Sequence, residues 1–123
     1  MSDAASNPDF DLSFLYEIAD GSDEFIVESI DMFSQQTPNL LAEIGNSIQS
    51  QSWLVAGAAA HKLKPNLGFF GMHTLQQMMG EIELIAKGGV PDADIISQKF
   101  EAAKQMIEAN LVKLQHIKAE KQG

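Results

Sequence analysis

The chain of 123 residues contains no cysteine and no arginine, and only one tryptophan and one tyrosine. Without cysteine it can form neither disulfides nor thiolate metal sites, a composition that suits a reducing compartment. Its 8 basic residues, all lysines, stand against 17 acidic residues and leave a net charge of −9. Nucleic-acid binding requires clustered basic residues that displace counterions from phosphates, so the composition argues against nucleic acid as a partner.

The chain also lacks long hydrophobic runs. None approaches the roughly 20 residues that a membrane span requires, and the N-terminus lacks the basic-then-apolar pattern of a signal peptide. We therefore expect a cytoplasmic protein that binds no membrane. With 45% hydrophobic residues, a chain of this length can form one core. We expect residues 1–9 to be a flexible N-terminus and residues 10–119 to form a single domain.

Helical periodicity accounts for nearly all of the sequence after residue 10. It predicts helices over residues 11–20, about 23–49, 52–69, 72–87 and from about 92 onward, with residues 120–123 frayed. Pro38 lies inside the second helix, where its missing amide should produce one kinked helix. The expected fold class is all-α: an antiparallel up-and-down four-helix bundle with a short extra N-terminal helix, and a monomer.

The third expected helix combines a regular core stripe with an unusual outer face. The stripe consists of Trp53, Ala56, Ala60, Leu63, Leu67 and Phe70. On a helical wheel His61 lies about 130° from the centre of this stripe and should point to solvent. Gly57, Lys64 and Gly68 share its face, at minus four, plus three and plus seven, and Leu54 lies at minus seven.

This helix is rich in residues that disfavour helices. Glycine costs a helix about 1 kcal/mol relative to alanine, and an interior proline costs about 3 kcal/mol. Gly57, Pro65 and Gly68 therefore cost several kcal/mol of helix preference around one histidine. Pro65 also deprives the carbonyl of His61 of its usual intrahelical partner. We interpret the cleared face as room for the backbone of another macromolecule to approach the imidazole.

The residue types on this face suit phosphoryl transfer. A neutral imidazole is a good nucleophile, and it is the form that prevails near neutral pH. A phosphoryl group on His61 would be dianionic, and Lys64 on the same face could stabilise it. No serine, cysteine or second carboxylate accompanies His61 for hydrolysis. The pattern is that of a covalent phosphate carrier whose catalytic machinery belongs to a partner.

The run His61-Lys62-Leu63-Lys64, with Gly68 and Gly71 downstream, resembles the histidine-containing phosphotransfer (HPt) domain of two-component phosphorelays. The similarity in element order covers about residues 11–117. The family usually has glycine four residues after the histidine, where this chain has Pro65. That departure removes no group that the chemistry needs.

The resemblance implies a phosphorelay intermediate. His61 would accept a phosphoryl group from the aspartyl phosphate of a response-regulator receiver domain and pass it to another receiver, with Lys64 stabilising the charge. Receiver domains and a hybrid sensor kinase would be the partners. The receiver would supply Mg²⁺, so the chain should need no metal or cofactor of its own. It has no glycine-rich nucleotide-binding box, so we expect no autokinase activity and no enzyme in the ordinary sense.

Two further features are predicted less directly. In some relatives a polar residue of the next helix hydrogen-bonds the imidazole. Gln76, Gln77 and Glu83 are candidates, with Gln76 ranked first because it faces away from the core stripe of its helix. Leu54 belongs either to a docking surface or to the edge of the core. The expected partner-binding residues are Leu54, Gly57, Lys62, Pro65, Gly68 and Gln76.

Three other functions fit the sequence less well. The chain could be a non-phosphorylated helical interaction module, but the presence of both His61 and Lys64 argues against that. A metal-binding bundle would need inward-facing histidine and carboxylate pairs, which His61, His73 and His116 do not supply. A phosphoester hydrolase would need an acid–base pair that the sequence lacks.

Overall fold

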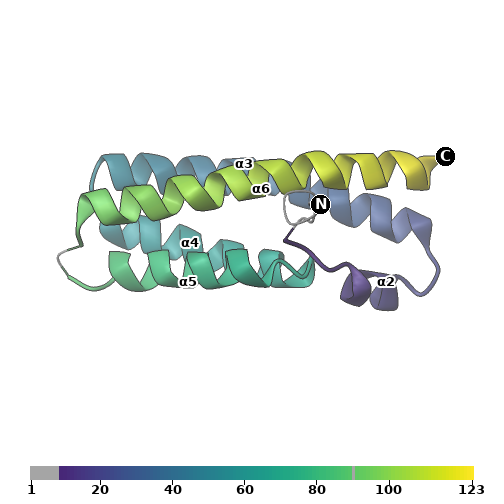
Figure 1. The fold of residues 1–123 in the computed structure, drawn as a ribbon, viewed down its shortest axis with the longest axis horizontal. Coiled ribbons are helices and arrows are strands. Elements are labelled where there is room, and N and C mark those ends of the chain that lie inside the picture. Colours follow the sequence, from purple (N-terminus) through teal and green to yellow (C-terminus); the bar gives the residue numbers. More distant parts are fainter. Residues whose placement is uncertain (1–8, 90) are drawn as a thin grey trace, which may run out of the picture.

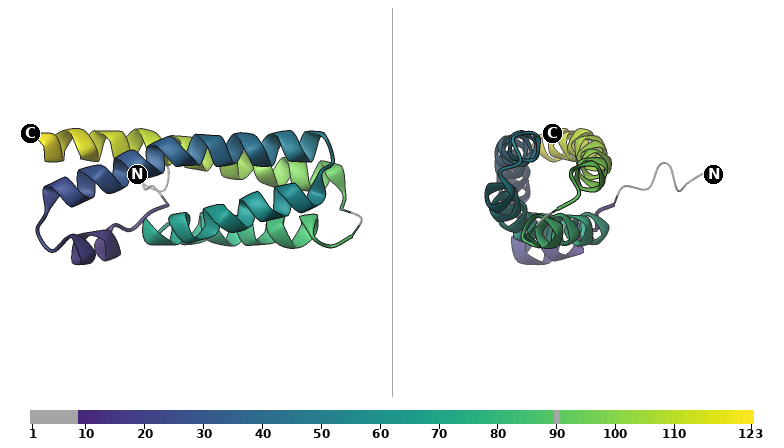
Figure 2. Two further views of the ribbon diagram at one scale, coloured as in Figure 1. Left: turned by 180° about the vertical axis from the view of Figure 1, so that it is seen from behind. Right: turned by 90° about the vertical axis from the view of Figure 1, so that its left-hand side faces the viewer.

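The computed structural model describes residues 9–89 and 91–123, which form an all-helical bundle. The helices are α2 (Ser13–Ala19), α3 (Asp23–Gln49), α4 (Trp53–Phe69), α5 (His73–Ala86) and α6 (Ala93–Gln122). Helices α3 to α6 run up and down and enclose one core, and α2 packs at the end of the bundle where α3 begins (Figures 1 and 2). The predicted fold class is confirmed. None of the described helices has the length and apolar character needed to cross a membrane.

Helices α3 and α6 begin at capping residues that the sequence shows. The Ser22 hydroxyl accepts a hydrogen bond from the Phe25 amide at the start of α3, 3.1 Å away. Asp92 caps α6 in the same way.

Helix α3 continues through Pro38 as one helix, and α4 continues through Pro65. The proline that replaces the family's usual glycine therefore leaves α4 unbroken.

The C-terminal helix is longer than predicted. Residues 120–122 are helical, so the expectation that they fray is wrong. Lys121 pairs with Asp23 at 3.6 Å, and Lys118 pairs with Asp31. These ion pairs tie the last turns of α6 to the first turns of α3, where acidic residues also favour the helix dipole.

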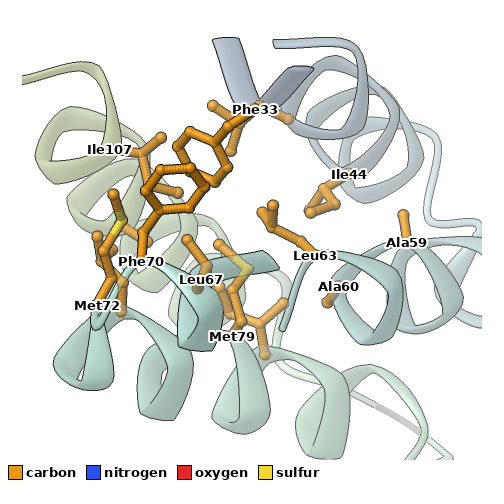
Figure 3. Close-up of a cluster of buried hydrophobic side chains, with 14 of the residues drawn as sticks. Phe33, Ile44, Ala59, Ala60, Leu63, Leu67, Phe70, Met72, Met79 and Ile107 are labelled. Atoms are coloured by element: carbon orange, nitrogen blue, oxygen red, sulfur yellow. The ribbon is translucent and has the colours of Figure 1, made fainter. Parts of the chain in front are cut away.

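The predicted stripe of α4 forms the centre of the core. Leu63 and Leu67 are fully buried, and Phe70 packs against Phe33 of α3 with ring centroids 4.6 Å apart (Figure 3). Trp53, at the start of the helix, is only half-buried. With α4 anchored through this face, the opposite face is held toward solvent.

An N-terminal strap, residues 9–12, crosses the turn between α4 and α5. The Asp9 carboxylate accepts hydrogen bonds from the amides of Thr74 and Leu75, at 3.4 and 3.0 Å, and so caps α5. The Asp9 carbonyl accepts a further bond from the buried Asn110 of α6, at 3.4 Å. The expectation of a flexible N-terminus is therefore wrong for Asp9, and residues 1–8 lie outside the described part of the chain.

Candidate functional site

His61 lies midway along α4 on the face turned away from the core. Its side chain is 66% exposed, which confirms the orientation predicted from the helical wheel. Lys62 and Pro65 beside it are exposed as well. Leu54, two turns earlier, is 77% exposed, so it belongs to the surface and not to the edge of the core.

Glu83 of α5 connects the polar groups of this surface. One of its oxygens, Oε2, lies 2.9 Å from Nδ1 of His61 and 2.9 Å from Nζ of Lys87. The other, Oε1, accepts a hydrogen bond from Nζ of Lys64 at 3.2 Å. The Glu83 side chain is only 14% exposed. One carboxylate thus contacts the histidine and two lysines at once.

Gln76 is not the hydrogen-bond partner of the imidazole, so the first-ranked prediction is wrong. Its Nε2 donates to the backbone carbonyl of Lys64, 3.2 Å away. Gln76 precedes Glu83 by seven residues, or two helical turns, so both face α4 but at different heights. Glu83, one of the three candidates, lies level with His61. Gln77 is exposed, and its side chain is absent from the hydrogen bonds of this site.

The glycines of α4 accommodate α5. A Cβ atom on Gly57 would lie 3.0 Å from Cγ of Lys87, and one on Gly68 would lie 2.6 Å from Nε2 of Gln76. Both positions are thus filled from within the chain, and Gly57 is buried. The interpretation that these glycines leave open space for a partner is wrong. They let α5 approach closely enough for its polar side chains to reach the His61 face.

The two lysines hold Glu83 in its charged form. The hydrogen bond from Lys87 lowers the pKa of Glu83 most, and those from Lys64 and His61 lower it further. Burial opposes them, but the net effect is a fall from 4.5 to about 2. Glu83 is therefore ionised throughout the neutral range.

Acid should weaken the fold through Glu83. A carboxyl with a lowered folded-state pKa stabilises the fold above its ordinary pKa and loses this contribution as the pH falls through the folded value. For Glu83 the window runs from 4.5 down to about 2. In urea titrations, the free energy of unfolding should fall more steeply across this window in the wild type than in Glu83→Gln. Glu81→Gln, with an exposed carboxylate on the same helix, should keep the wild-type slope; identical slopes in all three would contradict the assignment.

The geometry fixes which nitrogen of His61 is available for chemistry. An ionised carboxylate only accepts hydrogen bonds, so Nδ1 carries the proton in its contact with Glu83. In a neutral imidazole the other nitrogen, Nε2, then keeps its lone pair. The site thus offers one oriented nitrogen nucleophile on an exposed helix face, with cationic side chains beside it.

Lys87 is the residue of this site that the sequence analysis did not identify. It follows Glu83 by four residues, the spacing at which a glutamate and a lysine on one helix form an ion pair. That spacing could have identified Lys87 from the sequence once Glu83 had been assigned to the site. Among the described residues, no group of three histidine or acidic side chains is arranged to hold a metal ion.

The comparisons with known proteins bear on the same residues. Searches of curated proteins and of solved structures give no match. A family model described as the Hpt domain matches residues 28–111, which is more than half of the chain. The matched segment runs from the first turns of α3 into α6 and includes His61, Lys64, Glu83 and Lys87. The chain therefore belongs to the Hpt domain family, whose members are phosphocarrier modules of two-component phosphorelays.

Proposed function

We propose that this chain is a phosphorelay intermediate in which His61 receives a phosphoryl group from the aspartyl phosphate of one receiver domain and passes it to another. The observation that carries the proposal is the exposed imidazole whose Nδ1 is held by the ionised Glu83. This contact leaves Nε2 as the nucleophile. It lies on a helix face with no competing serine or cysteine nucleophile in the motif.

The transfer step needs little from this chain. The Nε2 lone pair of His61 forms a bond to phosphorus while the bond from phosphorus to the aspartyl oxygen breaks. The aspartate leaves as a carboxylate with the bonding electron pair, and the Nδ1 proton stays beside Glu83. The second transfer reverses these events on the next receiver. Mg²⁺ would come from the receiver, and ATP would take no part.

The docking surface would consist of the exposed residues around His61. Leu54, Lys62 and Pro65 are available for direct contact with a receiver. Gly57 and Gly68 would contribute differently, because they let α5 pack against α4. Gln76 would contribute through its hydrogen bond to the α4 backbone.

Intact-protein mass spectrometry tests the proposal. The chain is mixed with a phosphorylated receiver domain and Mg²⁺, and the mass is followed over time. We expect a single phosphoryl adduct that is lost in acid and survives in alkali, as a phosphoramidate bond requires. A folded helical chain that acquires no adduct from any of several receivers would contradict the proposal.

Replacing Lys64 by alanine should slow transfer without abolishing it. The Lys64 side chain is one-third exposed, and its Nζ would turn from Glu83 to a phosphoryl oxygen on His61. An exposed charge pair contributes about 0.5–1 kcal/mol, so the rate constant for adduct formation should fall about two- to fivefold. Lys99→Ala on α6 provides the control and should leave the rate unchanged. Complete loss of transfer in Lys64→Ala would show that this lysine does more than stabilise charge.

A further inference from the structure

Glu83 contacts the nitrogen of His61 that the phosphoryl group would not occupy. Its contact is to Nδ1, whereas the phosphoryl group would occupy Nε2, so the two do not compete for one nitrogen. The following inference rests on the proposed function and concerns the lifetime of the phosphorylated state.

We propose that Glu83 keeps the Nδ1 proton on phosphorylated His61 and thereby makes phospho-His61 a short-lived phosphoryl donor. This role is distinct from orienting Nε2 for attack, because it concerns the transfer of the phosphoryl group away from His61.

The chemistry depends on the leaving group. When an oxygen of water or of a receiver aspartate bonds to phosphorus, the phosphorus–Nε2 bond breaks and its electron pair returns to Nε2; with water the product is inorganic phosphate. If Nδ1 carries a proton, the phosphorylated ring is cationic and leaves as neutral imidazole; without that proton it must leave as imidazolate, a far poorer leaving group. An anion within hydrogen-bond distance of Nδ1 favours the protonated, cationic ring. Glu83 therefore extends the reactive form of phospho-His61 to higher pH.

The surroundings of Glu83 keep its charge directed at Nδ1. Lys87, the C-cap residue of α5, binds the same oxygen as His61, and Lys64 of α4 binds the other oxygen. The stem of Lys87 lies against Gly57, and Nζ of Lys64 lies 3.8 Å from the position of a Cβ on Gly80. When Lys64 turns to the phosphoryl group, Lys87 still binds Oε2. The carboxylate therefore cannot rotate away from His61 without breaking that ion pair.

No other described carboxylate bonds to His61, Lys64 or Lys87. Glu81 is the nearest acidic residue along α5, and it pairs with Lys99 of α6 at 3.3 Å. Lys62 is exposed on α4 beside His61 and adds a cation, which would disfavour a charged ring. Retention of the Nδ1 proton thus depends on Glu83 alone among the residues that the structure describes.

The experiment measures how the decay of phospho-His61 depends on pH. The full chain is phosphorylated with phosphoramidate, a small donor that releases ammonia as its phosphoryl group moves to Nε2. The donor is removed, and the adduct is followed by mass spectrometry from about pH 6 to about pH 9, on either side of the range where imidazole ordinarily titrates. Glu83→Gln keeps the size of the side chain and removes its charge. Glu81→Gln is the matched control on the same helix.

The wild type and Glu81→Gln should decay at nearly constant rates across this range. Decay of Glu83→Gln should slow as the pH rises, up to about tenfold for each pH unit above the point where Nδ1 loses its proton. By about pH 8.5 its adduct should last at least about five times longer than that of the wild type. Glu83→Asp, which keeps the charge, should restore most of the flat profile. Glu83→Gln also leaves Lys64 and Lys87 without their anion, and these cations likewise disfavour a charged ring. Both effects follow from removing the charge of Glu83.

The possible outcomes separate this inference from the proposed function. If the wild type forms an adduct on His61 but its decay profile coincides with that of Glu83→Gln, the role of Glu83 is refuted and the relay function stands. If neither phosphoramidate nor a phosphorylated receiver modifies His61, the proposed function itself fails.

Discussion

Replacing His61 by glutamine should abolish phosphorylation of the chain while leaving the bundle folded. The side chain is 66% exposed and makes one hydrogen bond, to Glu83, so its loss should change the free energy of unfolding by no more than about 1 kcal/mol. Glutamine has no nitrogen lone pair comparable to that of Nε2 and cannot form the adduct. Mass spectrometry after incubation with a phosphorylated receiver measures the first effect, and urea unfolding measures the second.

His116→Gln is the matched control. His116 is also exposed, but it lies on α6, away from the site. This variant should accept the phosphoryl group as the wild type does. An adduct that persists in His61→Gln and disappears in His116→Gln would place the phosphoacceptor on the wrong helix. A large loss of stability in His61→Gln would contradict the surface position of the histidine.

Replacing Gly71 by alanine should destabilise the bundle by about 3 kcal/mol. Gly71 has φ +69°, a left-handed conformation that costs a residue with a Cβ about 1–2 kcal/mol. The added Cβ would also overlap the backbone of Asp11 in the N-terminal strap. The strap would have to move, which would break the bond from the Asp11 amide to the Phe70 carbonyl and disturb the Asp9 cap, at about 1 kcal/mol each.

Gly21→Ala separates the two causes. Gly21 has φ +87° but would bring its Cβ within 4 Å of no other atom, so only the conformational cost of about 1–2 kcal/mol applies. Urea unfolding of both variants gives the comparison. Equal losses would show that the strap yields without cost, and that the family's later glycine serves only the turn.

Most of the fold could be predicted because helical periodicity and capping residues are local signals. Every described helix begins and ends within about two residues of its expected bounds, except α6, which continues past residue 119 to Gln122. The error at the two chain ends has one cause. Asp9 and Lys121 are held by partners distant in sequence, Leu75 and Asp23, and no local pattern reports such pairings.

The part of the site that lies on a single helix could be predicted from the sequence. His61 and Lys64 lie on α4, where the helical wheel fixes their face. The choice between Gln76 and Glu83 could not be made in this way, because it depends on the height at which α5 sits against α4. The wheel also shows an empty position at Gly57 without showing that a neighbouring helix fills it.

The N-terminal strap also restricts rotation of α5 about its own axis. Gln76, Glu83 and Lys87 all point toward α4 from the same side of this helix. A small rotation of α5 about its own axis would swing the carboxylate of Glu83 sideways, out of line with the imidazole. The Asp9 carboxylate caps the first turn of α5, and the Asp9 carbonyl accepts a hydrogen bond from Asn110 of α6. The Asp9 cap, more than two turns away from Glu83 along α5, thus helps to fix the rotation of α5 and the position of the Glu83 carboxylate relative to His61. Asp9 lies outside the segment that the family model matches.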